Sequence, residues 1–84
     1  MKIENVKAVI TGAGSGLGEG TARYLKDKGA KLLLIDLNAD GLKKVAKETD
    51  SKYFVGDVSN EEEMKKAIED FDGINCLVNC AGIA

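Results

Sequence analysis

Eight residues near the amino terminus, Thr11 to Gly18, constrain the fold most, because they read T-G-A-G-S-G-L-G. An apolar run, Ala8-Val9-Ile10, precedes them, and a helical pattern follows. Glycine lets a backbone turn tightly and approach a ligand without a Cβ atom in the way. A strand that passes through such a turn into a helix presents free N–H groups and the positive end of a helix dipole. The run therefore predicts a strand–turn–helix unit that binds phosphate groups.

Four short apolar runs predict strands, at residues 7–11, 31–36, 53–55 and 76–79. The run from Leu32 to Ile35 has no polar alternation, as expected for a parallel strand that is covered on both faces. Helical spacing predicts a helix in each interval between strands. The first runs from residue 16 to about residue 28 and stops at Gly29, the second begins after an Asn38 cap, and the third opens with a capping box from Ser59 to Glu62.

Each predicted helix has one apolar face that should cover the sheet. The residues expected on these faces are Leu17, Thr21, Tyr24 and Leu25 in the first helix, Ala39, Leu42, Val45 and Ala46 in the second, and Met64, Ala67, Ile68 and Phe71 in the third.

The resulting order, β-α-β-α-β-α-β with short connections, predicts an α/β fold with right-handed crossovers. We expect a Rossmann-like, doubly wound parallel sheet, of which this chain holds only the first β-α-β-α-β-α-β portion. At 84 residues the chain is at most one small domain, and a unit of this size is marginally stable alone. We therefore interpret residues 1–84 as the N-terminal part of a single dinucleotide-binding domain, with the catalytic part absent.

Charge and composition argue against several classes of partner. The 12 basic and 14 acidic residues are spread along the chain and give a net charge of -2. The sequence has no cluster of basic residues of the kind that binds nucleic acid or an anionic membrane. The longest strongly apolar run, from Leu32 to Ile35, is too short to span a bilayer. The first residues contain no secretory apolar segment, so a cytoplasmic location is expected.

The two cysteines, Cys76 and Cys80, are expected to be reduced thiols. Four residues of extended strand would separate them by roughly 13 Å, too far for a disulfide. Their spacing, in a chain without histidine, is also unsuited to zinc, so no metal site is predicted.

The glycine run is the first predicted site. Gly12 would make the turn, Gly16 would admit the phosphates, and Gly18 would let the helix pack closely on the sheet. The hydroxyl of Ser15 could donate a hydrogen bond to the ligand. The alternative is a tight strand–helix turn with no ligand.

Asp36 is the second predicted site, because it ends the second strand eighteen residues after Gly18. A carboxylate at this place accepts hydrogen bonds from the adenosine ribose hydroxyls and repels a 2′-phosphate, which favours NAD over NADP. The alternative is a helix-capping role, although Asn38 already suits it.

Two more sites follow the third and fourth strands. Asp57 could accept from the adenine amino group and Val58 could contact the ring, or Asp57 could simply be a turn residue before the next helix. The run Asn79-Cys80-Ala81-Gly82 ends the fourth strand at the expected switch point of the sheet, where small residues would let a ribose and nicotinamide pass. Asn79 could also tie neighbouring strands together through its side chain.

Taken together, these four motifs resemble the short-chain dehydrogenase/reductase family. Its turn T-G-x-x-x-G-x-G matches Thr11 to Gly18 at every fixed position, and its D-V pair matches Asp57-Val58. Its N-N-A-G motif appears as Asn79-Cys80-Ala81-Gly82, with cysteine in place of the second asparagine. The stretch from Val78 to Ala84 is similar to the type-2 3-hydroxyacyl-CoA dehydrogenase branch.

The resemblance implies that NAD is the cofactor and that hydride passes between it and an alcohol or carbonyl substrate. It implies cofactor contacts by Gly12, Ser15, Leu17, Gly18, Asp36, Asp57, Val58 and Cys80. The family's catalytic Ser, Tyr and Lys cannot be placed here, since Tyr24 and Lys28 have the spacing Y-x-x-x-K but lie on the first helix. This chain alone is expected to be inactive, and the family's substrate pocket and oligomer contacts would come from a C-terminal part, as one chain or a complementing one.

Two alternatives stay open at this point. The chain could be a free-standing nucleotide-binding module without catalysis. It could also be the first half of an S-adenosylmethionine methyltransferase, although that fold usually has an acidic residue where Thr11 stands.

Overall fold

A computed structural model describes residues 5–14, 16–57, 59–69, 71 and 73–80. Strands and helices alternate along the chain in the expected order. The elements are β1 (Lys7–Thr11), α1 (Gly16–Asp27), β2 (Lys31–Asp36), α2 (Ala39–Thr49), β3 (Lys52–Val55), α3 (Glu61–Glu69) and β4 (Cys76–Asn79).

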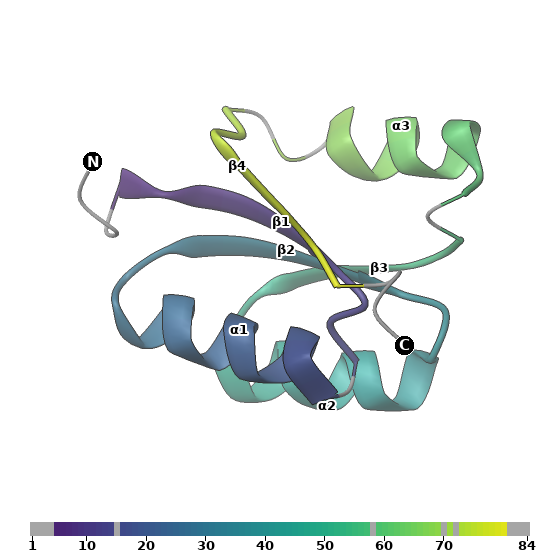
Figure 1. Ribbon diagram of the computed structural model, residues 1–84. Coiled ribbons are helices and arrows are strands. Elements are labelled where there is room, and N and C mark those ends of the chain that lie inside the picture. The colour runs from purple at the N-terminus through teal and green to yellow at the C-terminus, as the bar shows by residue number, and fades with distance from the viewer. Residues whose placement is uncertain (1–4, 15, 58, 70, 72, 81–84) are drawn as a thin grey trace.

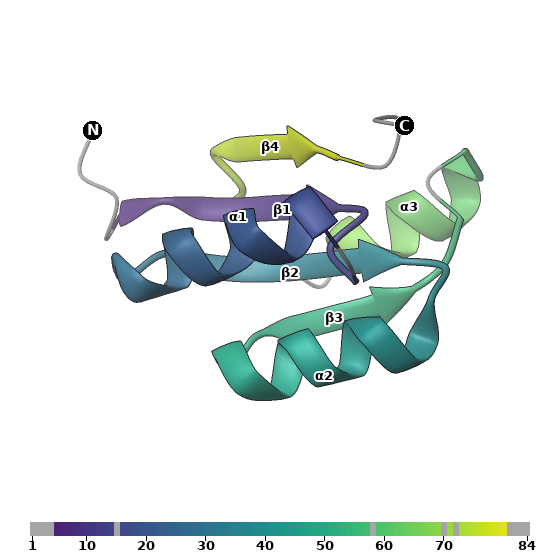
Figure 2. The same cartoon turned by 60° about the horizontal axis from the view of Figure 1, so that its bottom comes forward.

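The four strands form one parallel sheet in the order β3-β2-β1-β4. Helices α1 and α2 cover one face of this sheet, and α3 lies on the other (Figure 1). The sheet grows outward from β1 in both directions, first to β2 and β3 and then, after α3, to β4 on the opposite side (Figure 2). This is the doubly wound, Rossmann-like arrangement that the sequence predicts, and that prediction is confirmed.

The face toward α1 and α2 carries the larger core. Ile10 and Leu34 of the central strands share this core with Leu42 and Val45 of α2, and all four are fully buried. The expected apolar stripe of α2 is therefore correct for these residues and for Ala46.

The predicted stripe of α1 is wrong in part. Leu17 and Tyr24 are 60% and 58% exposed, whereas Gly18 and Ala22 are the buried residues of this helix. Small residues let the helix axis approach β1 closely, so the contact face is made of the side chains that a search for large apolar residues passes over.

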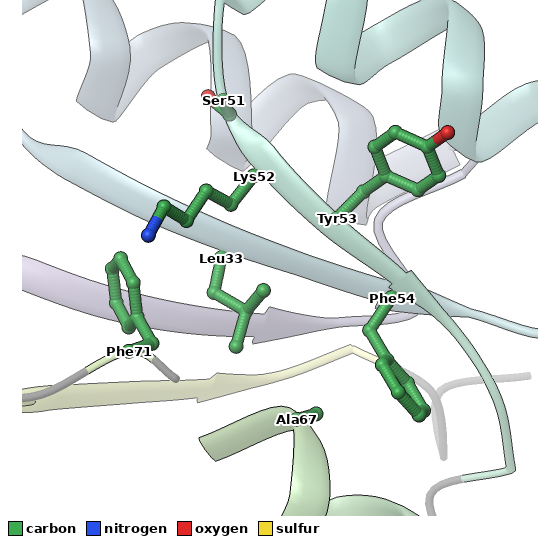
Figure 3. A pocket seen from close by; sticks show the side chains of 7 residues that line it. All are labelled: Leu33, Ser51, Lys52, Tyr53, Phe54, Ala67 and Phe71. Carbon is green, nitrogen blue, oxygen red and sulfur yellow. The ribbon is translucent and has the colours of Figure 1, made fainter. Parts of the chain in front are cut away.

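The opposite face is thinner. Val9, Leu33 and Ile35 pack there against Ala67 and Phe71. A pocket of about 580 Å³ lies between α3 and the β2–β3 part of the sheet, with Ala67 in its lining. Figure 3 shows Leu33, Phe54, Ala67 and Phe71 around it, with the Tyr53 ring directed away.

Helix ends agree with the sequence except at α3. The Asn38 side chain accepts from the Gly41 N–H at 3.3 Å, as predicted for an N-cap. At α3 the cap is Asn60, whose Oδ1 accepts from the Glu63 N–H at 3.1 Å. The predicted Ser59 cap is thus displaced by one residue, because the N–H and hydroxyl of Ser59 donate to Asp57 and asparagine is as good an N-cap as serine.

The strand β4 is hydrogen-bonded to β1, and Leu77 in its centre is 66% exposed.

In the part of the chain that the structure describes, no helix has the length and apolar character needed to cross a membrane.

Candidate functional site

The carboxyl ends of all four strands meet at one edge of the sheet (Figure 2). This edge brings together the glycine turn after β1, Asp36 at the end of β2, Asp57 after β3 and Asn79 at the end of β4. Parallel α/β sheets bind their ligands at such an edge, where the strand order reverses.

The glycine turn depends on glycine at two positions for different reasons. Gly12 has φ +70, and its N–H donates to the Ile35 carbonyl at 2.8 Å, which holds the turn against β2. A Cβ atom on Gly18 would lie 1.9 Å from the Gly12 carbonyl oxygen, so α1 can begin here only if residue 18 is glycine. The predicted close packing of the helix at Gly18 thus exists, but the contact is with the backbone of the glycine turn at Gly12.

Gly16 differs from these two because the space around it is open. It has φ +56, a conformation that favours glycine, and among the described residues beyond its chain neighbours no atom lies within 4 Å of a Cβ atom built there. Gly16 and Leu17 begin α1 and are both exposed, so the start of this helix is accessible at the sheet edge.

Asp36 is placed against the glycine turn. Its Oδ2 accepts from the Gly14 N–H at 2.8 Å, and its Oδ1 accepts from the Asn38 N–H at 3.0 Å. The carboxylate therefore joins the turn after β1 to the start of α2. It is half-buried, and each of its oxygens keeps lone-pair capacity for a further donor.

Asp57 is engaged in a local turn. Its Oδ1 accepts from both the N–H and the hydroxyl of Ser59, at 2.9 and 2.7 Å, and these hydrogen bonds lower the pKa of Asp57. Its own N–H donates to Glu63 Oε2 at 2.8 Å. This geometry favours the turn role that the sequence left open, while the contact of Asp57 with an adenine ring stays a prediction.

Asn79 ties β4 to β1 as anticipated. The Thr11 hydroxyl donates to Asn79 Oδ1 at 2.8 Å, and the Cys80 N–H donates to the Thr11 carbonyl at 3.1 Å. Cys80 itself is buried. Both Cys76 and Cys80 are free thiols.

Four of the predicted contact residues lie outside the described residues: Ser15, Val58, Ala81 and Gly82. Tyr24, on the outward side of α1, lies under Lys28 with the Nζ 5.7 Å from the ring centre. This agrees with interpreting their Y-x-x-x-K spacing as chance.

Among the residues with described positions, no group of three or more His, Cys, Asp or Glu side chains could hold a metal ion. The pocket in Figure 3 lies on the α3 face and is lined by none of the predicted site residues. The candidate site is therefore the open edge around the glycine turn.

Sequence reasoning missed two residues of this edge. Gly14 supplies the N–H that binds Asp36, and Gly41 lies against the Gly14 carbonyl. Gly41 could have been noticed in the sequence, because it lies inside a predicted helix. Glycine there costs up to about 1 kcal/mol of stability relative to alanine, and so indicates a position where the helix backbone packs closely on another segment.

Comparison with known proteins gives a consistent result. The family model described as short chain dehydrogenase matches residues 6–84. An uncharacterized oxidoreductase of Staphylococcus aureus strain N315 is 45% identical over 82 residues, which cover 89% of this chain and 36% of the relative. An uncharacterized oxidoreductase of Staphylococcus epidermidis is 39% identical over 87 residues, covering 96% of this chain and 38% of that protein.

Solved structures agree. A 3-ketoacyl-(acyl-carrier-protein) reductase from Brucella melitensis, complexed with NADH, matches with a TM-score of 0.84 and 34% identity over 89% of this chain and 34% of its own. A short chain dehydrogenase from Bacillus anthracis matches with a TM-score of 0.87 and 26% identity over 96% of this chain and 36% of its own. The chain thus spans about a third of the length of the proteins it matches.

Proposed function

Because this chain belongs to the short-chain dehydrogenase family, we propose that it is the NAD-binding part of an oxidoreductase acting on an alcohol or carbonyl substrate. The cofactor would lie along the carboxyl edge of the sheet, with its pyrophosphate at the start of α1. The match to an NADH-bound reductase supports a nicotinamide cofactor. The choice of NAD over NADP rests on this chain's own residues.

The glycine turn fits a pyrophosphate. The open space at Gly16 leaves room for phosphate oxygens, and the first N–H groups of α1 have no partner within the helix. The dipole of α1 adds a favourable interaction with negative charge at the same end. Gly12 and Gly18 would serve this site indirectly, by setting the path of the turn.

The position of Asp36 carries the proposal. Its two oxygens have accepted one backbone N–H each, from Gly14 and Asn38, so the carboxylate is held with lone pairs left for two ribose hydroxyls. A 2′-phosphate at the same place would be repelled by this negative charge. Phosphate and carboxylate oxygens both accept hydrogen bonds, so neither group would give the other a donor. We infer that NAD is preferred over NADP.

When bound, NAD supplies the hydride acceptor for an alcohol, and NADH the donor for a carbonyl compound. The residues described here would bind and orient this cofactor. Asn79 and Cys80 would hold the end of β4 on β1 through Thr11, so that the nicotinamide side can pass close to the backbone. The residues that polarise the substrate and move its proton would belong to the remainder of the protein, as would contacts within a homo-oligomer or with a complementing chain. A cytoplasmic location is part of the same proposal.

Titration calorimetry with NAD and NADP tests this assignment. We expect NAD to bind the full-length protein more tightly, and Asp36→Asn to weaken NAD about tenfold, since charge-assisted hydrogen bonds are worth 1.5–3 kcal/mol. The same change should improve NADP binding. Asp40→Asn, on the exposed first turn of α2, is the matched control and should change neither affinity. Tighter binding of NADP by the unmodified protein would overturn the cofactor assignment.

Turnover separates an oxidoreductase from a binding module. The full-length protein should change the 340 nm absorbance of NADH with a panel of ketones and aldehydes. NAD binding without turnover on any of them would favour the non-catalytic module instead.

A further inference from the structure

The first turn of α2 packs on the backbone of the glycine turn at unusually short range. A Cβ atom built on Gly41 would lie 2.4 Å from the Gly14 carbonyl oxygen and 2.9 Å from Asn38 Nδ2. The closeness is mutual, because a Cβ atom on Gly14 would lie 2.8 Å from Asp36 Oδ2 and 3.2 Å from the Leu42 nitrogen. Two segments separated by more than twenty residues therefore approach so closely that neither Gly14 nor Gly41 has room for a side chain.

Hydrogen bonds connect this contact to the carboxylate of Asp36. The Gly14 N–H donates to Asp36 Oδ2 and the Asn38 N–H to Asp36 Oδ1. Asn38 in turn caps α2 by accepting from the Gly41 N–H. The orientation of Asp36 thus depends on the distance between the glycine turn and the first turn of α2.

The helix α2 has little freedom to move away. Leu42 and Val45 are fully buried and Ala46 nearly so, in the core beneath β1 and β2. Ordinary van der Waals contact begins at 3.4 Å, so a methyl group at residue 41 would require a displacement of about 1 Å from the Gly14 oxygen. Because α2 is fixed by its core, the strain of that methyl group would fall on the contact with Gly14.

We propose that Gly41 is a positioning residue for Asp36: its missing side chain lets α2 press on Gly14 and so keeps the Gly14 N–H on the carboxylate that selects the cofactor. This inference rests on the proposed function. Gly41 would act through Gly14 and Asp36 and would not itself contact the cofactor.

The test compares two helical glycines in the full-length protein. Gly41→Ala places a methyl group against Gly14, whereas Gly20→Ala on α1 places one in open space. Both changes raise helix propensity equally. Calorimetry with NAD and NADP gives two dissociation constants for each variant.

We expect Gly41→Ala to raise the NAD dissociation constant about tenfold, because the Gly14 N–H bond to the Asp36 carboxylate is a hydrogen bond to a charged group. The NADP constant should change less, so the ratio of the two constants narrows. Gly20→Ala should keep the ratio of the unmodified protein. If Gly41→Ala weakens the binding of NAD and NADP by the same factor, the ratio of the two dissociation constants stays unchanged and the positioning role is refuted. A loss of folded protein would affect both nucleotides alike.

A second readout does not require any nucleotide. The Gly14 amide, bonded to Asp36, should exchange slowly with solvent in the unmodified protein, and Gly41→Ala should accelerate its exchange as seen by NMR. If the unmodified protein binds neither nucleotide, the proposed function fails while this measurement still decides the positioning role. Unaltered Gly14 exchange would overturn it.

Should Gly41→Ala fail to fold, a pair of changes at Asn38 takes its place. Asn38→Ala removes the acceptor for the Gly41 N–H, and Asn38→Ser restores a capping oxygen. We expect the dissociation constants for NAD and NADP to become more similar in Asn38→Ala, and to return toward the ratio of the unmodified protein in Asn38→Ser. The same ratio in both variants would contradict the inference.

Discussion

The hydroxyl of Thr11 donates to Oδ1 of Asn79 at 2.8 Å, across 68 residues of sequence. These residues are paired in the register of β1 with β4, so the side-chain bond lies beside the backbone ladder. Thr11 is 4% exposed, and its hydroxyl is therefore a largely desolvated group with one partner. The bond fixes the carboxyl end of β4 at the candidate site.

Replacing Thr11 by valine should weaken this attachment. Valine keeps the β-branched shape but leaves Asn79 Oδ1 without its donor, and we expect the free energy of unfolding to fall by about 1 kcal/mol. Urea denaturation followed by circular dichroism measures the change. A double-mutant cycle with Asn79→Ala should show that the two losses are not additive, and full additivity would contradict a direct bond.

Gly18 and Gly20 lie on the same helix and should respond in opposite ways to alanine. A methyl group on Gly18 would overlap the Gly12 carbonyl, whereas one on Gly20 would lie more than 4 Å from every other atom outside its own helix turn in the described part of the chain. We expect Gly18→Ala to destabilise the fold by more than about 3 kcal/mol, as overpacking against backbone does, and Gly20→Ala to stabilise it by about 0.5 kcal/mol. Thermal unfolding of the two variants decides this, and similar melting temperatures would be the contrary result.

Asp57 gives the fold a small acid-sensitive contribution. Hydrogen bonds from Ser59 lower the pKa of Asp57 below its ordinary value of 3.8, so the folded state favours the charged carboxylate. The resulting stability is present above pH 3.8 and is lost as the pH falls through the lowered pKa. Ser59→Ala should return the Asp57 pKa toward its ordinary value, as measured by NMR titration of the carboxyl carbon.

Ser59→Thr is the matched control, because it keeps the hydroxyl that donates to Asp57. The threonine variant should titrate like the unmodified protein. An unshifted titration in Ser59→Ala would show that the Ser59 hydroxyl is not the main cause.

Leu77 should promote self-association of the 84-residue chain. It is 66% exposed in the centre of β4, a strand whose described hydrogen bonds run to β1. Exposed apolar edge strands pair with one another, and an edge lysine opposes this pairing. We expect Leu77→Lys to lower the light scattering of concentrated samples at unchanged helix content. Tyr53→Lys, on β3 at the other side of the sheet, is the comparison for a general effect of charge.

Much of the fold was accessible from the sequence because its strands are short and apolar and its turns contain glycine. The run Leu32–Ile35 is nearly fully buried, as its lack of alternation predicts. The placement of Asp36 next to the glycine turn also followed, since parallel strands that end at one edge bring their last residues together.

The errors have identifiable physical causes. The buried face of α1 was sought among large side chains, but Gly18 and Ala22 form it. The cap of α3 was ambiguous by one residue because Ser59 and Asn60 both precede a glutamate at the required spacing. The contact of Gly41 with Gly14 depends on the distance between two distant segments, which no local pattern encodes.

Asp36 has consequences for redesign that its negative charge alone does not suggest. Exchanging it for a smaller or basic residue, with the aim of accepting a phosphorylated ribose, would strip acceptors from two amides at once, those of Gly14 and Asn38. A swap of coenzyme preference through such residues would therefore need a second substitution that satisfies those amides. A single exchange for a smaller or basic residue should yield a variant that is impaired with either dinucleotide, unlike Asp36→Asn, which keeps one acceptor oxygen.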